Sequence, residues 1–131
     1  MIIVDTTVWI DYFNGLRKLH TDWLDIQLVR QRLGLTDLIL CEVLQGVRDD
    51  RQWQQLHHDL LKFEVFETGG VDLAVAAAQN YRVLRRQGLT VRAAIDGLIA
   101  TFCLLNGYQL LHNDRDYDVF ESALGLKVIH P

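Results

Sequence analysis

The sequence alternates short apolar, β-branched runs with longer stretches in which apolar residues recur every three or four positions. Residues 2–4, Ile-Ile-Val, are typical of a buried strand, whereas Ile95, Leu98 and Phe102 fall on one stripe of a helix. The pattern predicts strands at residues 2–4, 33–36, 63–66, 109–112 and 127–129. It predicts helices at residues 6–15, 21–32, 37–45, 50–61, 71–87, 91–106 and 114–124.

Strands and helices that alternate in this order are typical of an α/β fold. We therefore expect a short, mostly parallel central sheet of about four or five strands, flanked by about seven helices. The chain has 131 residues, half of them hydrophobic, and no Gly/Ser/Pro-rich linker or internal repeat. These features predict a single domain over residues 1–131.

The N-terminus, the most apolar window and the cysteines indicate the cellular compartment of the protein. The N-terminus lacks the basic start and long apolar stretch of a secretory signal, and the most apolar window, residues 93–105, is shorter than the roughly 20 residues of a membrane span. Cys41 and Cys103 lie in apolar helical patterns without a CxxC pair, and we expect reduced thiols in the core rather than a disulfide. A cytoplasmic protein that does not enter the membrane is expected.

Four carboxylates interrupt this apolar pattern. Asp5 directly follows the first strand, and Asp114 follows the strand at residues 109–112, while Glu42 and Asp96 stand inside otherwise apolar helical runs. In α/β folds, ligand sites form at the carboxyl ends of strands. Taken one at a time, each acid has an ordinary alternative, since Asp5 and Asp114 could cap helices, and Glu42 and Asp96 could lie on exposed helix edges.

As a set, these acids favour a metal site. A buried carboxylate is costly unless it is paired or bound to a cation, and near Asp96 the local sequence supplies only Arg92. All-oxygen ligands suit Mg²⁺ or Mn²⁺ rather than zinc. The net charge of −4 at first argues against a nucleic-acid partner, but it describes long-range steering rather than what a local site binds.

Four blocks of the chain occur in a characteristic order: the opening Ile-Ile-Val-Asp-Thr-Thr-Val-Trp-Ile at residues 2–10, the helix that carries Glu42, residues 91–100 and residues 111–117. Together they resemble PIN-domain ribonucleases, particularly the VapC toxins of bacterial toxin–antitoxin pairs. The resemblance covers essentially the whole chain. It implies a three-layer PIN-domain fold and a Mg²⁺- or Mn²⁺-dependent endoribonuclease that cleaves RNA, with tRNA or rRNA as the expected target, and leaves a 5′-phosphate and a 3′-hydroxyl.

The resemblance also implies roles for individual residues. The catalytic metal ligands would be Asp5, Glu42, Asp96 and Asp114, with Asp116 as a further ligand. Supporting positions beside these ligands would be Thr6, Thr7 and His112, and Thr7 is the one expected to orient a carboxylate or a bound water. This chain departs from the family at His112, where most members have Thr, so any hydroxyl contact at that position is in doubt.

The resemblance further implies partners. A VapC-type toxin binds a small VapB-type antitoxin, which often places a basic side chain in the acidic pocket, and commonly forms a homodimer. Aromatic residues that suit such apolar interfaces, or equally the core, are Trp9, Tyr12, Phe13 and Trp53. RNA phosphates would be contacted by Arg82, Arg85, Arg86 and Arg92, whose alternative role is a solvated helix face.

Two other functions remain open from the residues. A phosphatase of the haloacid dehalogenase type would place Asp-x-Asp after the first strand, but position 7 is Thr, and both it and a receiver domain need a pocket lysine. The lysines of this chain, at positions 18, 62 and 127, lie outside the acidic motifs. The other alternative is a PIN-fold module that binds RNA or protein without cutting, against which the intact acid set argues.

Overall fold

A four-stranded parallel sheet, in the order β3-β2-β1-β4, lies at the centre of the molecule. The structure, a computed structural model, describes all residues from 1 to 131. The strands are β1 (Ile2–Val4), β2 (Leu33–Thr36), β3 (Glu64–Phe66) and β4 (Gln109–Leu111). The helices are α1 (Thr6–Phe13), α2 (Leu19–Gln27), α3 (Asp37–Gln45), α4 (Asp50–Leu60), α5 (Val71–Arg86), α6 (Ala94–Asn106), the short 3-10 helix η1 (Arg115–Tyr117) and α7 (Asp118–Leu124).

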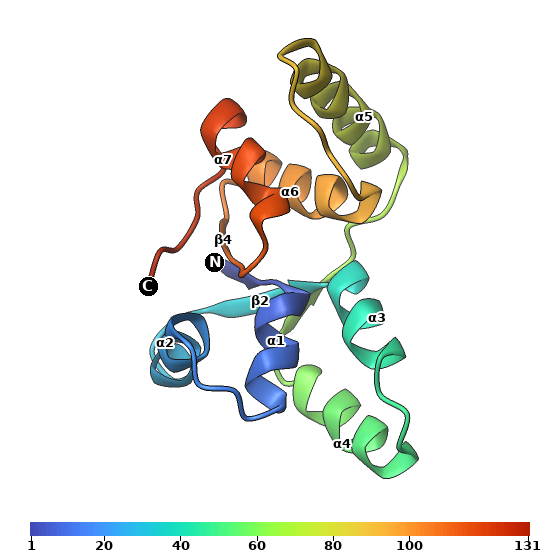
Figure 1. Cartoon of the computed structure of the whole chain (residues 1–131). Helices are drawn as coiled ribbons and strands as arrows, with labels where there is room; N and C mark the ends of the chain where they lie inside the picture. The colour runs from blue at the N-terminus through green and yellow to red at the C-terminus, as the bar shows by residue number, and fades with distance from the viewer.

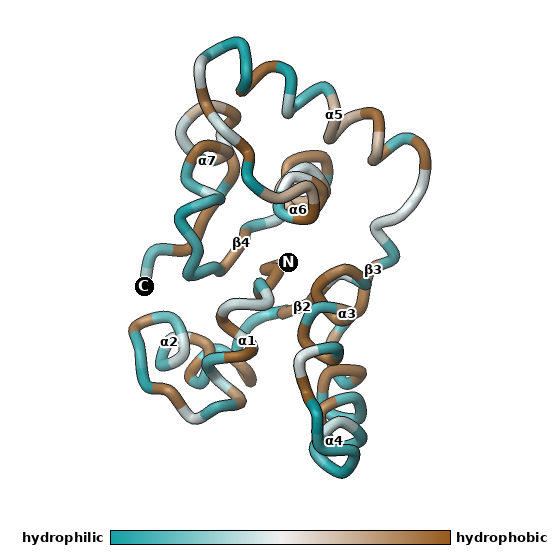
Figure 2. Tube along the Cα trace, turned by 45° about the vertical axis from the view of Figure 1, so that its right-hand side comes forward, coloured by the Kyte–Doolittle hydropathy of each residue, from teal (hydrophilic) through white to brown (hydrophobic).

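Helices cover both faces of the sheet (Figure 1). Helices α1 to α4 lie on one side of the sheet and α5 to α7 on the other, which gives three layers. The two central strands are apolar because helices cover both their faces, and every residue of β1 and β2 is buried. In Figure 2 the tube is mainly teal along α4, in keeping with its outer position. The predicted α/β fold is therefore confirmed.

Several predicted boundaries differ from the structure, and three of them have a clear local reason. Helix α2 begins at Leu19, ahead of the predicted start at Thr21, because the Thr21 hydroxyl accepts a hydrogen bond from the Lys18 backbone NH (2.8 Å) and donates one to the Leu16 carbonyl (2.7 Å). The same helix ends at Gln27 instead of residue 32, since residues 28–30 form the turn that leads into β2. Helix α6 begins at Ala94, because the backbone of Ala93 is still extended.

The C-terminal part of the chain also differs from the prediction. The helix predicted at residues 114–124 is divided into η1 and α7. The strand predicted at residues 127–129 is reduced to one parallel bridge between Leu110 and Val128. The Lys127 carbonyl accepts from Leu110 NH (2.8 Å), and Ile129 NH donates to the Leu110 carbonyl (2.9 Å). A single bridge leaves the sheet with four strands rather than five.

The expectation that both cysteines lie in the core was wrong for one of them. Cys103 is fully buried on α6, but Cys41 is exposed on α3. Among the aromatic residues left open by the sequence, Trp9 belongs to the core, whereas Phe13 is exposed. No helix is long and apolar enough to cross a lipid bilayer.

Candidate active site

The sheet brings the predicted acids together at the carboxyl ends of its central strands. Asp5 follows β1, Asp114 and Asp116 follow β4, and Asp96 lies in the first turn of α6. One carboxylate oxygen from each of Asp96, Asp114 and Asp116 lies within 4.8 Å of the other two. Parallel neighbours β1 and β4 end at the same edge, which explains why residues over 100 positions apart along the chain meet here.

Asp5 is the most deeply buried of these acids, with 3 % of its surface exposed. Its Oδ2 accepts hydrogen bonds from the Thr7 hydroxyl (2.7 Å) and the Thr7 backbone NH (3.2 Å), so it also caps α1. Its Oδ1 accepts one from the hydroxyl of Tyr117 (2.8 Å). These three donors fix the orientation of the carboxylate.

Glu42 and Asp114 are also held by neighbours. Glu42 Oε1 accepts a hydrogen bond from the Thr6 hydroxyl (2.8 Å), which links α3 to the start of α1. Asp114 Oδ1 accepts one from the Asp116 backbone NH (2.9 Å), which caps the η1 helix. Each polar contact leaves carboxylate lone pairs available for a cation.

The site is short of positive charge. The pKa of Asp96 is raised from 3.8 to about 7, first by burial and then by the charges of Asp5, Asp114, Asp116 and Glu42. Burial also raises the pKa of Asp5, against the opposing effect of its hydrogen bonds. Arg92 forms the nearest ion pair, with Nε 3.9 Å from Asp116 Oδ1 and 79 % of its side chain exposed. A cluster of carboxylate oxygens with so little positive charge nearby fits a hard divalent cation, Mg²⁺ or Mn²⁺.

His112 contacts two residues of the site, Asp114 and Tyr117. Its Nδ1 accepts a hydrogen bond from Asp114 NH (3.1 Å), and its ring packs on the Tyr117 ring at a centroid distance of 4.8 Å. Its side chain is buried, with 7 % exposed, and burial lowers its pKa. A neutral ring that accepts at Nδ1 carries its proton on Nε2, which has no hydrogen-bond partner.

The four arginines predicted to contact RNA are not all placed alike. Arg92 lies in the extended segment before α6, beside the acids. The other three, Arg82, Arg85 and Arg86, are exposed in the last turns of α5. That end of α5 lies at the far end of the segment that leads back to α6 (Figure 1). Their contact with phosphates stays a prediction.

The sequence reasoning missed Tyr117. Its side chain is fully buried, and its hydroxyl donates to the most buried acid of the site. A hydroxyl on a buried aromatic ring needs a hydrogen-bond partner, and position 117 follows directly after two of the acids. An aromatic hydroxyl directly after two acids is therefore a signal in the sequence that could have identified Tyr117 as a supporting residue.

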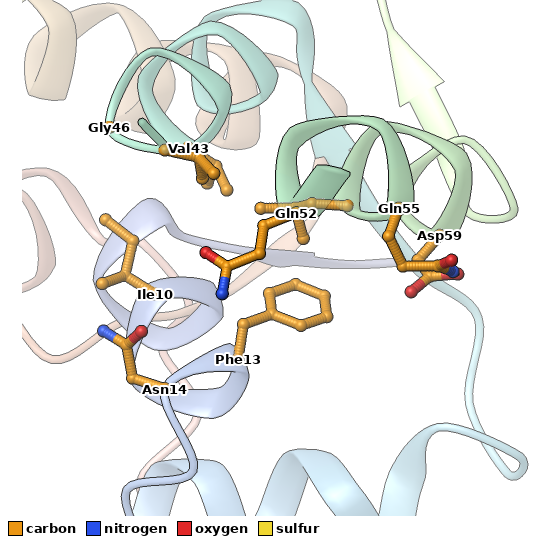
Figure 3. A pocket seen from close by; sticks show the side chains of 10 residues that line it. Ile10, Phe13, Asn14, Val43, Gly46, Gln52, Gln55 and Asp59 are labelled. Atoms are coloured by element: carbon orange, nitrogen blue, oxygen red, sulfur yellow. The ribbon is translucent and has the colours of Figure 1, made fainter. Parts of the chain in front are cut away.

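A second hollow lies away from the acids. A groove of about 340 Å³ lies between α1 on one side and the end of α3 and α4 on the other, and we call it the α1–α4 groove. In Figure 3 Ile10 and Phe13 of α1 face Gln52 and Gln55 of α4 across it. Its other lining residues are Asn14, Val43, Gly46, Val47, Leu56 and Asp59. Such a half-apolar groove suits an apolar segment of a partner.

Comparison with known proteins decides the family. Residues 2–122 match the family model of the PIN domain. The chain belongs to the PIN-domain family. Within it, the chain belongs with the VapC ribonucleases, because it is 31 % identical over 132 residues to VapC ribonuclease Mb1587 of Mycobacterium bovis and to ribonuclease VapC11 of Mycobacterium tuberculosis. The matches cover 97 % of this chain and 96 % of each relative.

Solved structures show the same PIN-domain fold. VapBC2 from Rickettsia felis, bound to a DNA fragment from its promoter, aligns with a TM-score of 0.78 at 18 % identity and covers 98 % of both chains. FitAcB from Neisseria gonorrhoeae aligns with a TM-score of 0.76 at 22 % identity and covers 100 % of this chain and 98 % of that chain. At these identities the likeness concerns the fold alone. The predicted family and fold are both confirmed.

Proposed function

We propose that this PIN-domain protein is the toxin of a type II toxin–antitoxin pair and cleaves RNA as a Mg²⁺- or Mn²⁺-dependent endoribonuclease. The observation that carries the proposal is the trio of carboxylate oxygens from Asp96, Asp114 and Asp116, all within 4.8 Å of one another. Membership of the VapC ribonuclease family supports the same activity. A non-catalytic PIN module would have no need of so many mutually repelling acids.

The residues divide the work between holding a cation and orienting its ligands. Asp5, Glu42, Asp96, Asp114 and Asp116 are the proposed ligands. A divalent cation held by these residues would lower the pKa of a bound water and offset the charge that develops on the phosphate, and the expected products are a 5′-phosphate and a 3′-hydroxyl. Thr7 holds Asp5 in place, and Thr6 does the same for Glu42.

The RNA substrate must approach an acidic surface. We propose tRNA or rRNA as the target, with Arg92 gripping a phosphate beside the acids and the three arginines of α5 contacting the strand farther away. We also propose that the protein is cytoplasmic and forms a homodimer.

Cleavage of a purified tRNA and rRNA pool tests this function. With Mg²⁺ or Mn²⁺ we expect discrete fragments that carry 5′-phosphate ends, and we expect EDTA to abolish them. Asp114→Asn should reduce the rate at least about a hundredfold, because it removes a charged ligand from the cation. The matched control is Asp118→Asn, which changes an exposed acid on α7 and should cut like the unaltered protein.

Two results would contradict the proposal. Cutting that persists in EDTA would exclude the metal mechanism. Metal-loaded protein that binds RNA without cutting any species in the pool would favour the binding module instead.

The antitoxin is proposed to lie in the α1–α4 groove. Ile10 and Phe13 are large apolar side chains, 39 % and 38 % exposed at its edge, and burying them against a partner would be favourable. Phe13→Asp places a charge in this apolar surface. We expect it to weaken binding of the VapB-type antitoxin about tenfold or more, as for a central interface residue, while RNA cleavage is retained.

Isothermal titration of the two purified proteins checks the groove. Val29→Asp is the control, because Val29 is 92 % exposed and lies outside the groove. If both substitutions weaken antitoxin binding equally, or if neither weakens it, the antitoxin binds elsewhere.

A further inference from the structure

The hydrogen bonds around Asp5 limit how this carboxylate can hold a cation. A carboxylate offers about four lone-pair sites, two on each oxygen. Both donors from Thr7 reach Oδ2, and the Tyr117 hydroxyl reaches Oδ1. Three of the sites are therefore occupied, and the remaining one is on Oδ1. Asp5 is left with a single lone pair for a metal ion, on the oxygen that Tyr117 already holds.

Tyr117 is itself rigidly placed. Its ring is fully buried, packed against the buried ring of His112 at 4.8 Å, and it lies at the end of η1, directly after Asp114 and Asp116. A hydroxyl on a fixed ring has little freedom to follow the carboxylate if the carboxylate turns. The direction of the free lone pair of Oδ1 is thus set by the Tyr117 hydroxyl.

We propose that Tyr117 is a positioning residue of the metal site, which holds Asp5 so that it binds the cation through Oδ1 alone. This inference rests on the proposed metal-dependent function. His112 contributes indirectly, because the same ring that packs on Tyr117 accepts a hydrogen bond from the Asp114 backbone. His112 therefore contacts both the backbone of Asp114 and the Tyr117 ring that orients Asp5, and these two proposed ligands follow different strands.

The direct test is Tyr117→Phe, which removes one hydroxyl and leaves the buried ring. Without that donor, both lone pairs of Oδ1 are free, and the carboxylate can rotate about the contacts with Thr7. Removal of such a supporting hydrogen bond is expected to weaken Mn²⁺ binding about 10- to 100-fold. Mn²⁺ affinity is measured by calorimetry on the metal-free protein, which does not depend on activity.

Kinetics separate positioning from a general loss of structure. The Mn²⁺ concentration for half-maximal RNA cleavage should rise by the same factor in Tyr117→Phe, while kcat at saturating Mn²⁺ and KM for RNA stay close to those of the unaltered protein. The matched control is Tyr108→Phe, since Tyr108 precedes β4 at the opposite end of the strand and packs on Phe66 and Phe102. Its Mn²⁺ affinity should not change.

Each outcome has a clear meaning. Mn²⁺ affinity of Tyr117→Phe within twofold of the unaltered protein would overturn the positioning role while leaving the proposed nuclease intact. Failure of the unaltered protein to bind Mn²⁺ would instead remove the proposed function on which the inference rests. A lower melting temperature with unchanged Mn²⁺ affinity would mean that the hydroxyl serves stability alone, and would also overturn the role.

Discussion

Asp96→Asn is expected to abolish metal-dependent RNA cleavage and, in the metal-free protein, to raise stability at neutral pH. The loss of cleavage follows from removing a proposed metal ligand whose pKa is raised by burial and by four neighbouring carboxylates. It should reach at least about a hundredfold. The gain in stability follows because an amide of nearly the same shape carries no charge, which burial would otherwise desolvate and the neighbouring acids would repel. Loss of activity together with a gain in stability is typical of a site whose residues are selected for function.

The pH dependence of this stability gain has a definite sign. Asp96 has a pKa of about 7 in the folded protein against 3.8 for an ordinary carboxyl, so between these values the folded state binds the extra proton. The contribution of Asp96 to stability therefore falls as pH rises from about 4 to about 7. The variant lacks this loss, so its advantage should be small at pH 4 and largest at pH 8.

Urea unfolding of both metal-free proteins across this pH range measures the effect. Asp118→Asn serves again as the control, because Asp118 is exposed on α7 and is not among the groups that raise the pKa of Asp96. An Asp96→Asn variant that is less stable than the unaltered protein at pH 8 would show that burial and the neighbouring acids do not penalise the Asp96 charge as described.

The local pattern of the sequence was sufficient for the fold. Strands β1 and β2 are buried on both faces, so their residues are nearly all apolar and easy to recognise. Helix ends were less predictable, because they depend on individual hydrogen bonds that the pattern of apolar residues does not encode. The Thr21 hydroxyl bonds across the start of α2, and a single bridge at Val128 decides that residues 127–129 do not form a strand.

The acids of the site were recognisable for a different reason. A charge inside an apolar helix, as at Asp96, is costly unless something compensates it, and therefore stands out. Asp5 and Asp114 also show that two interpretations of one residue need not exclude each other, since each caps a helix and also faces the acidic cluster. Tyr117 did not stand out, because an aromatic residue in a buried position looks like ordinary core until its hydroxyl is seen to meet Asp5.

Mn²⁺ binding to the unaltered protein is expected to weaken steeply as pH falls below 7. A cation and a proton compete for the Asp96 carboxylate, and a metal binds only the deprotonated form. With a pKa of about 7, the apparent Kd should rise roughly 25-fold between pH 7.5 and pH 5.5. An ordinary carboxylate, with a pKa near 4, is already ionised over that whole range and would give almost no change.

Calorimetry in two buffers of different ionisation enthalpy measures both the affinity and the protons released. About half a proton should leave for each Mn²⁺ bound at pH 7, rising toward one proton at pH 5.5, if Asp96 dominates the competition. In Asp96→Asn the release should disappear and the weakened affinity should be nearly independent of pH. A flat Kd in the unaltered protein would show that Asp96 is ionised before the cation arrives, and that the acids are compensated by Arg92 or by solvent rather than by the metal. Because the same proton that stabilises the metal-free fold must leave for the cation to bind, the unfolding free energy and the apparent Kd should both stop changing with pH above about pH 7.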